Sequence, residues 1–451
     1  MYLSNQRRMK ISIIGVGYVG LVTGACFAEW GHEVICIDID RNRIEFLKLG
    51  KIPIYEPGLE ELVLRNAQQG RLNFSTNSEE AIKSTEVVIN AVGTPLNKDN
   101  KADLSAVESV ARVFGQNLNK RTVFVNKSTI PMGGATHLST LILESCEKQE
   151  TPLLDGAKFF EVVSNPEFLR EGSAIQDFMN PDRIVIGVES EWARQVMEQL
   201  YEPLRAKGIP LMITSCANAE AIKYASNAFL ATKISFINEM ASLCEIYGAN
   251  IEEVAQGMGM DPRIAPAFLK AGIGYGGSCL PKDVMQLIVS GQGKGAEMSL
   301  LRAVDHINRT QPMRMMARLK EVYPELRGLT FAIWGLTFKP ETDDIRESAA
   351  MQIIPELIKE GAMIRVFDPQ GMINAKKQLG ETVHYAEDHT SALKGADALL
   401  ILTEWEIFKK ADLDQIKKNL KKPIVIDGRN LYDLNEMKSK GFVYKSIGRT
   451  L

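Results

Sequence analysis

The sequence has few of the residues that support metal or disulfide chemistry. Its 451 residues contain six cysteines and five histidines, scattered without a CxxC, an HExxH or another close cluster. This usage indicates a reducing compartment, and neither disulfides nor a metal site is predicted. No apolar run reaches the about 18 residues of a membrane-spanning helix, so no membrane segment is expected.

Little net charge is present either. A formal net charge of −3 gives no general attraction to nucleic acid or to an anionic membrane. Residues 1–9 are expected to be a polar, basic stub, because they lack the apolar centre of a secretory signal. Met9 is the expected start of the fold. The protein is therefore expected in the cytoplasm, and any anionic ligand must be held by local side chains.

What the sequence does have is a regular alternation of strand-like and helical segments. Strands are predicted at 10–14, 33–37, 87–91, 122–126, 160–163 and 184–188, and again at 329–335, 363–369, 398–405 and 423–430. Strands that alternate with helices predict doubly wound parallel sheets. The segment 214–246 is predicted to be one long helix, apolar around most of its circumference and therefore buried on both sides.

We therefore expect an α/β protein with two Rossmann-like, doubly wound parallel-sheet domains joined by a long central helix. A chain of 451 residues is too long for a single core. The expected divisions are the stub 1–9, a dinucleotide-binding domain 9–212, a central helical domain 213–325 that carries the long helix, and a second Rossmann-like domain 326–451.

A glycine fingerprint follows the first predicted strand directly. Gly15 would make the tight turn, Gly17 would admit a pyrophosphate, and Gly20 would let the helix pack on the strand. Asp38 ends the second strand, where it could accept ribose hydroxyls and repel a 2′-phosphate, which favours NAD over NADP. The predicted cofactor residues here are Gly15, Val16, Gly17, Tyr18, Val19, Gly20, Asp38 and Arg43. The alternative is an ordinary structural turn.

A second glycine-rich segment, GIGYGGSCLPKD at 272–283, contains Cys279 just before an expected helix start. Pro281 suits the first turn of a helix, so the thiol would lie near the positive end of a helix dipole. That setting favours a nucleophilic thiolate, which could capture an oxidised carbonyl covalently. A buried, inert cysteine is the alternative, and this segment alone leaves both possibilities open.

Polar residues at helical spacing could complete a catalytic site. Lys223 and Asn227 are four residues apart on the long helix and could stabilise an oxyanion, or could be a snorkelling lysine beside a packed asparagine. Glu167 and Glu171 are also four apart, and one could be a general base for water with a pKa raised by burial, although a solvated pair is the common case. Asp283 follows Cys279 by four residues, so on a helix it would face back toward the thiol.

Two turns follow strands at the carboxyl edge, where doubly wound sheets bind ligands. VGTPL at 92–96 and NKSTIP at 126–131 place Thr94 and Thr129 there. Both threonines could donate hydroxyls near a nicotinamide, or both segments could be ordinary turns. The third candidate turn, GLTFKP at 335–340, lacks the three glycines and is expected to hold something other than the dinucleotide.

Together these motifs resemble the UDP-glucose 6-dehydrogenase family, from Met9 to about Gly448. The motifs are GVGYVGL (15–21), VGTP (92–95), STIP (128–131), NPEFLREGSAI (165–175), the pair Lys223 and Asn227, GYGGSCLPKD (274–283), GLTFKPETDDIRES (335–348) and IDGRN (426–430). They occur in the family's order. Leu280 departs from the pattern, since an aromatic residue is often found there.

The resemblance implies a four-electron oxidation of a sugar-nucleotide C6 alcohol to a carboxylate with two NAD⁺. In the first step Asp283 would accept the proton, through a water near Thr129, while Lys223 and Asn227 stabilise the oxygen. Cys279 would then capture the aldehyde as a thiohemiacetal, and a second hydride transfer would give a thioester. A thioester keeps the aldehyde from escaping while the cofactor is exchanged.

The resemblance also assigns the last step and the binding residues. Water assisted by Glu167 would hydrolyse the thioester. The implied additional cofactor residues are Thr94, Thr129, Glu171, Lys282 and Arg346. The implied UDP-glucose residues are Phe168, Leu169, Glu171, Lys223, Asn227, Arg263, Phe268, Lys270, Gly272, Tyr275, Gly276, Lys339 and Arg429, with the last domain binding the UDP-sugar. A homodimer or a higher homo-oligomer is expected, in which Arg263 reaches the neighbouring subunit's site.

Three alternatives stay open at this point. A related enzyme would oxidise GDP-mannose or a UDP-N-acetylhexosamine with the same cysteine. A two-electron hydroxyacid dehydrogenase would keep Cys279 only as a structural residue. A non-catalytic protein of this fold would bind NAD without reducing it.

Overall fold

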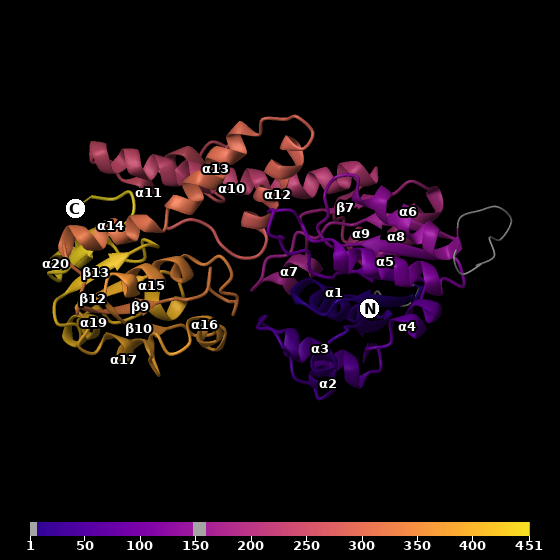
Figure 1. The fold of residues 1–451 in the computed structure, drawn as a ribbon, viewed down its shortest axis with the longest axis horizontal. Helices are drawn as coiled ribbons and strands as arrows, with labels where there is room; N and C mark the ends of the chain where they lie inside the picture. The colour runs from indigo at the N-terminus through magenta and orange to yellow at the C-terminus, as the bar shows by residue number, and fades with distance from the viewer. Residues whose placement is uncertain (1–6, 148–158, 451) are drawn as a thin grey trace. The chain divides into compact units, whose positions relative to one another are not determined.

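The structure is a computed structural model that describes residues 7–147 and 159–450. The chain forms two compact units, 1–225 and 226–451 (Figure 1). Residues 1–6 of the predicted N-terminal stub lie outside the described residues, whereas Met9, the expected start of the fold, is 1% exposed. The boundaries predicted at 212/213 and 325/326 stay a prediction.

Among the described residues, the first unit forms an eight-stranded sheet in the order β3-β2-β1-β4-β5-β6-β7-β8. The strands are β1 (Lys10–Ile14), β2 (Glu33–Ile37), β3 (Leu72–Ser75), β4 (Val87–Asn90), β5 (Thr122–Asn126), β6 (Phe160–Ser164), β7 (Ile184–Gly187) and β8 (Leu211–Thr214). Strand β4 is buried along its whole length, as expected where helices cover both faces of a parallel sheet. The order reverses between β1 and β4, and this switch point is where doubly wound sheets bind ligands.

One pair of strands differs from the predicted parallel arrangement. Strand β7 runs antiparallel to β6, with Ser164 opposite Gly187, and β8 runs parallel to β7. Only the turn at 165–173 and the short helix α7 (Ala174–Met179) separate β6 from β7. Because this segment does not return the chain to the amino edge, β7 starts where β6 ends and runs in the opposite direction.

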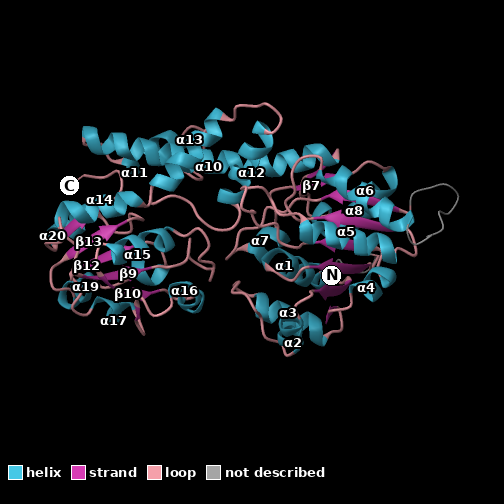
Figure 2. Cartoon of the chain, in the orientation of Figure 1, coloured by secondary structure: helices cyan, strands magenta, loops and turns pink. Residues whose placement is uncertain are grey.

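Helices alternate with the strands throughout the first unit (Figure 2). Besides α7 they are α1 (Tyr18–Glu29), α2 (Arg41–Lys48), α3 (Leu59–Gln68), α4 (Ser78–Ser84), α5 (Ser105–Asn117), α6 (Gly134–Glu147), α8 (Glu191–Leu200) and α9 (Glu202–Arg205). Local chemistry sets several of their starts. Asp40 caps α2 by accepting N–H bonds from Asn42 and Arg43.

The second unit repeats the same architecture with a six-stranded sheet, ordered β11-β10-β9-β12-β13-β14 and parallel at every described pair. Its strands are β9 (Thr330–Trp334), β10 (Met363–Phe367), β11 (His384–Tyr385), β12 (Ala398–Ile401), β13 (Ile424–Asp427) and β14 (Val443–Lys445). The prediction of two Rossmann-like sheets is confirmed. The unpredicted strands β3, β8, β11 and β14 are the edge strands of the two sheets, and each has only two to four residues, too few for a clear sequence pattern.

The helices of the second unit fall into two groups. A helical layer precedes the sheet, and the remaining helices alternate with the strands. They are α11 (Ile251–Gly259), α12 (Leu280–Gln292), α13 (Ser299–Thr310), α14 (Met313–Val322), α15 (Ala349–Lys359), α16 (Met372–Leu379), α17 (His389–Leu393), α18 (Glu406–Lys409), α19 (Leu413–Asn419) and α20 (Leu434–Ser439).

The predicted long helix is α10 (Cys216–Tyr247), with 32 residues. The expectation that α10 is buried on both sides is wrong for the single chain. Phe229, Phe236 and Leu243 are 65%, 42% and 46% exposed, and Ile246 is exposed as well. Phe229, Phe236 and Leu243 recur every seven residues, so they lie on one face of the helix. Apolarity around a helix predicts that its faces prefer burial, but it does not require the same chain to cover them.

Candidate active site

The glycine turn of the first unit joins β1 to α1 in the predicted way. Gly15 has φ +97°, and a Cβ there would lie 2.9 Å from the backbone of Ala91, so only glycine fits the turn. A Cβ on Gly20 would lie 1.8 Å from the carbonyl oxygen of Gly15, which explains why α1 can pack so closely. Gly17 caps α1 without a side-chain hydrogen bond, and a Cβ there would meet nothing within 4 Å.

This open helix start fits a dinucleotide pyrophosphate. The N-cap residue of α1, Gly17, has no side chain to cap the helix, and the first turn contains no acidic residue. Such a helix start attracts an anion, because its N–H groups and dipole present positive charge. The residues that would hold NAD here are Gly15, Val16, Gly17, Tyr18, Val19 and Gly20.

Asp38 lies beside this turn, as the second strand predicts. Its Oδ2 accepts the Val16 N–H at 3.0 Å, and its Oδ1 accepts the Asp40 N–H at 3.0 Å. Arg43 Nη1 lies 3.4 Å from Asp38 Oδ2. The carboxylate is thus fixed next to the turn, where it could also accept ribose hydroxyls.

The two predicted threonine turns lie together at the carboxyl ends of β4 and β5. The Thr94 hydroxyl donates to the carbonyl oxygen of Thr129 at 3.0 Å, and the Ser128 hydroxyl donates to that of Val92 at 2.7 Å. A small cavity adjoins them. Its lining includes Thr129 and Lys223, together with Asn126, Ser128, Ile130, Ser164, Pro166, Glu220 and Tyr224.

Lys223 and Glu167 form a buried ion pair in the first unit. The Lys223 Nζ donates to Glu167 Oε1 at 2.9 Å and to the Glu167 carbonyl oxygen at 2.6 Å, and both side chains are buried. Burial alone would raise the pKa of Glu167, but the charge and hydrogen bond of Lys223 lower it below its ordinary value. Both residues were predicted to be catalytic, but the sequence did not predict that they pair.

The predicted substrate residues Phe168 and Leu169 continue the same turn. The Leu169 N–H donates to Glu167 Oε2 at 2.6 Å. The ring of Phe168 lies between the Arg183 guanidinium, 4.0 Å from its centroid, and the Lys223 ammonium, at 5.4 Å. Glu171 is half-buried two residues further along the chain.

Glu56 anchors this turn and was missed by the sequence analysis. The buried Glu56 carboxylate accepts the N–H groups of Gly172 and Ala174, each at 2.7 Å, and so caps the start of α7. A carboxylate in a polar segment that ends near a helix gave no local signal, because its partners are more than 100 residues away. Glu220 was missed as well, because its partners, the N–H groups of Gly133 and Ala135 at the start of α6, lie 87 and 85 residues away in the chain.

In the second unit, Cys279 is the N-cap residue of α12, as predicted from the glycines and Pro281. Cys279 is exposed, whereas the other five cysteines are buried, and none of the six forms a disulfide. Burial raises the pKa of Cys36 to about 12 and also raises the pKa values of Cys26, Cys146 and Cys216. The accessible thiol at a helix start is therefore the one suited to nucleophilic chemistry.

Asp283 is held in the first turn of α12, four residues after the thiol. Its N–H donates to the Cys279 carbonyl oxygen at 2.9 Å. The Asp283 carboxylate is buried and accepts two bonds, from Asn227 Nδ2 at 2.6 Å and from Lys282 Nζ at 2.5 Å. Asn227 thus contacts the carboxylate predicted to accept the proton, and Lys282, predicted to bind the cofactor, is paired with it.

The loop that carries Cys279 packs on the segment 338–347 of the same unit. A Cβ on Gly276 would lie 2.2 Å from the Glu347 carbonyl oxygen, and a Cβ on Gly277 would lie 2.8 Å from the Phe338 ring. The Gly277 N–H donates to the Arg346 carbonyl oxygen at 2.9 Å. The glycines of this loop are therefore required for close packing between two backbones.

Arg429 ties three segments of the second unit together. Its guanidinium donates to the carbonyl oxygens of Leu402 at 2.9 Å, Gly274 at 3.3 Å and Phe338 at 3.2 Å, and it lies 3.2 Å from a Glu404 carboxylate oxygen. The side chain was predicted to help bind a diphosphate. In this structure the same side chain also fixes the loops around that predicted site.

The remaining predicted binding residues are spread over the second unit. Arg263 is exposed and forms a bidentate pair with Asp261, and Phe268 has a left-handed φ of +64°. Arg346 pairs with Asp344 at 2.7 Å. Gly272 and Gly276 are buried, Tyr275 is half-buried with a pKa raised by burial, and Lys270 is exposed, while the Lys339 ammonium lies 5.4 Å from the Phe338 ring centroid.

The turn of the second sheet begins like that of the first and then diverges. Gly335 has φ +98°, its N–H donates to Phe367 O, and the Leu336 N–H donates to Asp368 Oδ2 at 2.7 Å. No helix follows directly: α15 begins only at Ala349, where the Ser348 side chain caps it by accepting the Met351 N–H. That this turn holds something other than the dinucleotide stays a prediction.

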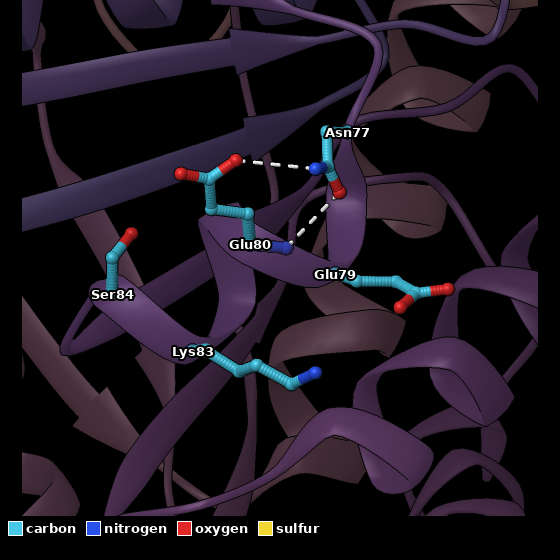
Figure 3. A pocket seen from close by; sticks show the side chains of 5 residues that line it. All are labelled: Asn77, Glu79, Glu80, Lys83 and Ser84. Atoms are coloured by element: carbon cyan, nitrogen blue, oxygen red, sulfur yellow. Dashed lines mark hydrogen bonds between the residues drawn. The ribbon is translucent and has the colours of Figure 1, made fainter.

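Figure 3 shows a surface hollow over α4 of the first unit, lined by Asn77, Glu79, Glu80, Lys83 and Ser84. Asn77 caps the helix by accepting the Glu80 N–H at 3.2 Å and donates to Glu80 Oε2 at 3.1 Å. These bonds are ordinary helix capping, and the predicted site residues lie elsewhere.

Within residues 7–147 and 159–450, no cluster of three or more His, Cys, Asp or Glu residues is arranged to hold a metal ion. In the same part of the chain, no helix combines the length and apolarity that crossing a bilayer requires.

A Rossmann-like unit with an open glycine turn, and a second unit with an exposed thiol at a helix start beside a buried aspartate, define a dinucleotide-dependent oxidoreductase of the nucleotide-sugar dehydrogenase class. The UDP-glucose/GDP-mannose dehydrogenase family matches in three parts: its NAD-binding domain at residues 9–205, its central domain at 217–310 and its UDP-binding domain at 332–434. The chain belongs to this family.

Individual relatives agree with the family match. The chain is 46% identical over 440 residues to the UDP-glucose 6-dehydrogenase TuaD of Bacillus subtilis, covering 98% of this chain and 93% of the relative. It is similar to the structure of a UDP-glucose dehydrogenase from Pyrobaculum islandicum, with 37% identity, a TM-score of 0.89 and 99% of each chain covered. A UDP-D-ManNAc dehydrogenase from Pyrococcus horikoshii is similar too, with 27% identity, a TM-score of 0.84, and 98% of this chain and 99% of that chain covered.

Proposed function

We propose that this protein oxidises the C6 alcohol of UDP-glucose to the carboxylate of UDP-glucuronate, with two NAD⁺ reduced per substrate. The observation that carries the proposal is Cys279: an exposed thiol at the start of α12, four residues before a buried Asp283 that is held by Asn227. A two-electron alcohol oxidation needs no nucleophile. A thiol in this place is useful where an aldehyde must be captured and oxidised again.

NAD supplies a hydride acceptor when it is bound. The open turn at Gly15 to Gly20 would bind its pyrophosphate, and Asp38 would bind a ribose of the cofactor. We propose that Arg43, Thr94, Thr129, Glu171, Lys282 and Arg346 complete the cofactor site.

In the first oxidation, the C6 hydroxyl proton leaves to Asp283, through a water positioned by Thr129, and the C6 hydride leaves to the acceptor that NAD supplies. Asp283 suits this role because it is a buried carboxylate already oriented by two donors, Asn227 and Lys282. Lys223 and Asn227 would stabilise the developing alkoxide. The product of this step is the C6 aldehyde.

In the second oxidation, the Cys279 sulfur adds to the aldehyde carbon while the carbonyl oxygen takes up the thiol proton, which forms a thiohemiacetal. Loss of a second hydride from C6 to the acceptor that NAD supplies, together with loss of the hydroxyl proton, converts this adduct to a thioester. The thioester remains covalently attached, so the intermediate cannot leave between the two oxidations.

Hydrolysis completes the reaction. Water adds to the thioester carbonyl with Glu167 as the base, the C–S bond breaks, and the Cys279 thiol is restored. Glu167 can accept the proton because Lys223 lowers its pKa and keeps the carboxylate ionised at neutral pH, although the same shift makes it a weaker base. The Lys223 ammonium, 2.9 Å from that carboxylate, would stabilise the tetrahedral oxyanion.

The substrate contacts belong to the same proposal. Local cations must hold the diphosphate, because the net charge of −3 supplies no positive field. The proposed substrate residues are Phe168, Leu169, Glu171, Lys223, Asn227, Arg263, Phe268, Lys270, Gly272, Tyr275, Gly276, Lys339 and Arg429.

We further propose that the protein acts as a homodimer. The exposed stripe of Phe229, Phe236 and Leu243 on α10 is supporting evidence, since an apolar stripe of this kind favours association with a second copy. Arg263 is exposed and would reach the partner's site. Phe229→Glu together with Phe236→Glu should give a monomer in size-exclusion chromatography with light scattering. A dimer that survives both changes contradicts this interface.

We propose a cytoplasmic location because of the cysteines. Six cysteines without a disulfide are typical of a reducing compartment.

The experiment that tests the function is NADH stoichiometry with limiting UDP-glucose. Two NADH per UDP-glucose support the proposal, whereas one NADH supports a two-electron dehydrogenase with a structural Cys279. No NADH with any nucleotide sugar, from protein that still binds NAD, supports the non-catalytic alternative.

A second candidate substrate rests on the likeness to the UDP-D-ManNAc dehydrogenase structure. Initial rates on UDP-glucose, GDP-mannose and UDP-N-acetylmannosamine, at equal concentrations, distinguish the candidates. We expect UDP-glucose to be oxidised fastest, and a faster rate on either of the other two would overturn the assignment of substrate.

A further inference from the structure

Lys127 is a buried lysine that the proposed mechanism does not use. It follows β5 directly and is only 4% exposed. Its Nζ lies 3.1 Å from Asn165 Oδ1, 3.4 Å from the Asn165 carbonyl oxygen and 3.5 Å from the Tyr201 hydroxyl oxygen. These are neutral partners at long distances, so they compensate poorly for burying an ammonium.

The lysine's main contact, Asn165, is itself fixed firmly. The Asn165 N–H donates to Asn126 O at 3.0 Å, its Nδ2 donates to Val185 O at 2.9 Å, and the Tyr201 hydroxyl donates to its Oδ1 at 2.6 Å. Glu167 is two residues further along. Lys127 therefore lies at a rigid point from which the turn that carries Glu167 departs.

Lys127 is one member of a group of buried charged side chains. Three buried ionisable side chains, Lys127, Lys223 and Glu167, influence one another electrostatically. Two ammonium groups thus act on the Glu167 carboxylate, and these three side chains together carry one net positive charge when both lysines are protonated. Tyr201 is the other titratable group at Lys127, and burial raises the pKa of its hydroxyl, so it stays neutral.

The pKa of Lys127 reflects this balance. Burial lowers it to about 8, while the Glu167 charge acts to raise it and the Lys223 charge to lower it. At neutral pH the ammonium is thus largely protonated, although it is buried. The Lys127 charge in turn lowers the pKa of Glu167, after the larger contributions of Lys223.

We propose that Lys127 is a positioning residue for thioester hydrolysis: it anchors the Asn165–Glu167 turn and supplies the second positive charge that keeps the Glu167 carboxylate ionised beside Lys223. This inference rests on the proposed function, because it assigns a partner to the base of the last step. Lys127 does not contact the reacting atoms in this role, and it acts through Glu167.

The first test is the pH profile of kcat for Lys127→Met, Lys127→Arg and the wild-type protein, followed into the acid limb to the lowest pH at which all three proteins stay folded. Loss of the charge should move the acid limb of Lys127→Met to higher pH by about one unit. Lys127→Arg keeps the charge and should keep the wild-type profile. Lys83→Met, an exposed lysine on α4 of the same unit, serves as the surface control and should change nothing.

Two results would overturn the proposal. One is a Lys127→Met protein whose kcat falls by the same factor at every pH, since this identifies Lys127 as a structural anchor only. The other is an equal shift in Lys127→Arg and Lys127→Met, since the charge would then not be the cause.

A second measurement does not depend on activity. The pKa of Lys127 is lowered from 10.5 to about 8 in the fold, so the unfolded chain binds the proton more tightly. The buried charge is relieved as pH rises through about 8, and the free energy of unfolding should therefore increase between pH 8 and 10.5. Lys127→Met should lack this part of the increase that Lys83→Met retains.

If the free energy of unfolding depends on pH in the same way in both variants, position 127 does not carry a buried charge that destabilises the fold. The NADH stoichiometry of the wild-type protein is measured first. If that stoichiometry fails, the proposed function is wrong, whereas the unfolding comparison still decides whether Lys127 carries a buried charge.

Discussion

The two Rossmann-like units use one turn for different purposes. In both, a left-handed glycine ends the first strand, the next N–H donates to an aspartate after the second strand, and the glycine N–H donates to that second strand. In the first unit α1 starts at once, at Tyr18, with an open cap at Gly17. In the second unit the chain first makes a long loop, and α15 starts at Ala349 with a serine cap.

The aspartates differ in the same way. Asp38 accepts two backbone N–H groups and lies beside Arg43. Asp368 is buried and accepts bonds from Leu336 N, Thr337 N, Thr337 Oγ1, Gln370 N, Gly371 N and Trp405 Nε1. The second carboxylate is saturated by its own fold. A turn of this kind can bind a ligand only while its helix start and its acidic residue are left for the ligand to contact.

The loop inserted in the second unit supports the loop that carries Cys279. Its segment 338–347 packs on the glycines of the Cys279 loop, at Gly276 and Gly277. The first unit's turn would thus bind the cofactor, and the second unit's turn positions the proposed nucleophile.

The largest expected effect comes from removing that nucleophile. Cys279→Ser keeps a good N-cap residue but lacks the thiol, so UDP-glucuronate formation should fall by about 10³-fold or more, with the first oxidation retained. Rapid mixing, with the amounts of NADH and UDP-glucuronate followed over time, would show NADH from the first oxidation without UDP-glucuronate. Cys146→Ser, at a buried cysteine of the first unit, is the control. Full turnover by Cys279→Ser refutes the covalent route.

The next largest effect should be on stability, from Asp368→Asn. Replacing one acceptor oxygen by an NH₂ group leaves buried N–H donors unpaired, so the free energy of unfolding should fall by about 3 kcal/mol. Asp38→Asn should cost less stability but weaken NAD binding. Urea unfolding and NAD titration of both variants measure the contrast, and equal stability losses would contradict the difference between the two carboxylates.

A third variant tests the open cap of the first unit. Gly17 has φ −78°, which aspartate adopts without strain. Gly17→Asp should therefore fold normally, because aspartate is a good cap, and should weaken NAD binding by about 100-fold through repulsion of the pyrophosphate. Isothermal titration calorimetry measures the Kd, and unchanged affinity would place the pyrophosphate elsewhere.

Ser348→Ala is the matched change at the closed cap of the second unit. It should cost about 1 kcal/mol of stability and leave the Kd for NAD unchanged, since Ser348 accepts a bond from its own helix.

A change of pH should affect the stability of the two units differently. His32 of the first unit is buried, and burial lowers its pKa from 6.5 to about 4. As pH falls, the imidazole is therefore protonated in the unfolded chain before it is protonated in the folded one. Between pH 6.5 and pH 5 the free energy of unfolding of the first unit should decrease by about 2 kcal/mol. Hydrogen exchange of peptides from β1 and α1, measured in the wild-type protein and in His32→Gln, reports this loss of stability. An equal loss in His32→Gln would assign the sensitivity to other groups.

Much of the fold could be predicted because local residues specify local structure. The glycine fingerprint, the buried β-rich runs and the cysteine ahead of Pro281 each depend on neighbouring residues. The antiparallel β7 could not be predicted, because strand direction depends on how a whole connection crosses the sheet. The exposed stripe on α10 could not be predicted either, because an apolar pattern does not say what covers it.

The site divides in the same way. The residue types and their helical spacing identified Lys223, Asn227, Glu167 and Asp283 as candidates. Their pairing was not foreseen. Glu56 and Lys127 were missed, although a lysine directly after a fully buried strand, in NKSTIP, was a usable signal for the latter.

By itself the sequence determined which residues can do chemistry and where the backbone must turn, because glycine, proline and a lone cysteine act through their own geometry and reactivity. Only the tertiary structure decided that Lys223 pairs with Glu167 and Asn227 with Asp283, each 56 residues away. It alone decided that one turn stays open while the other closes on Asp368. Such choices depend on burial and on distant partners, and the energies of buried charges are set by the groups that the fold brings within a few ångströms.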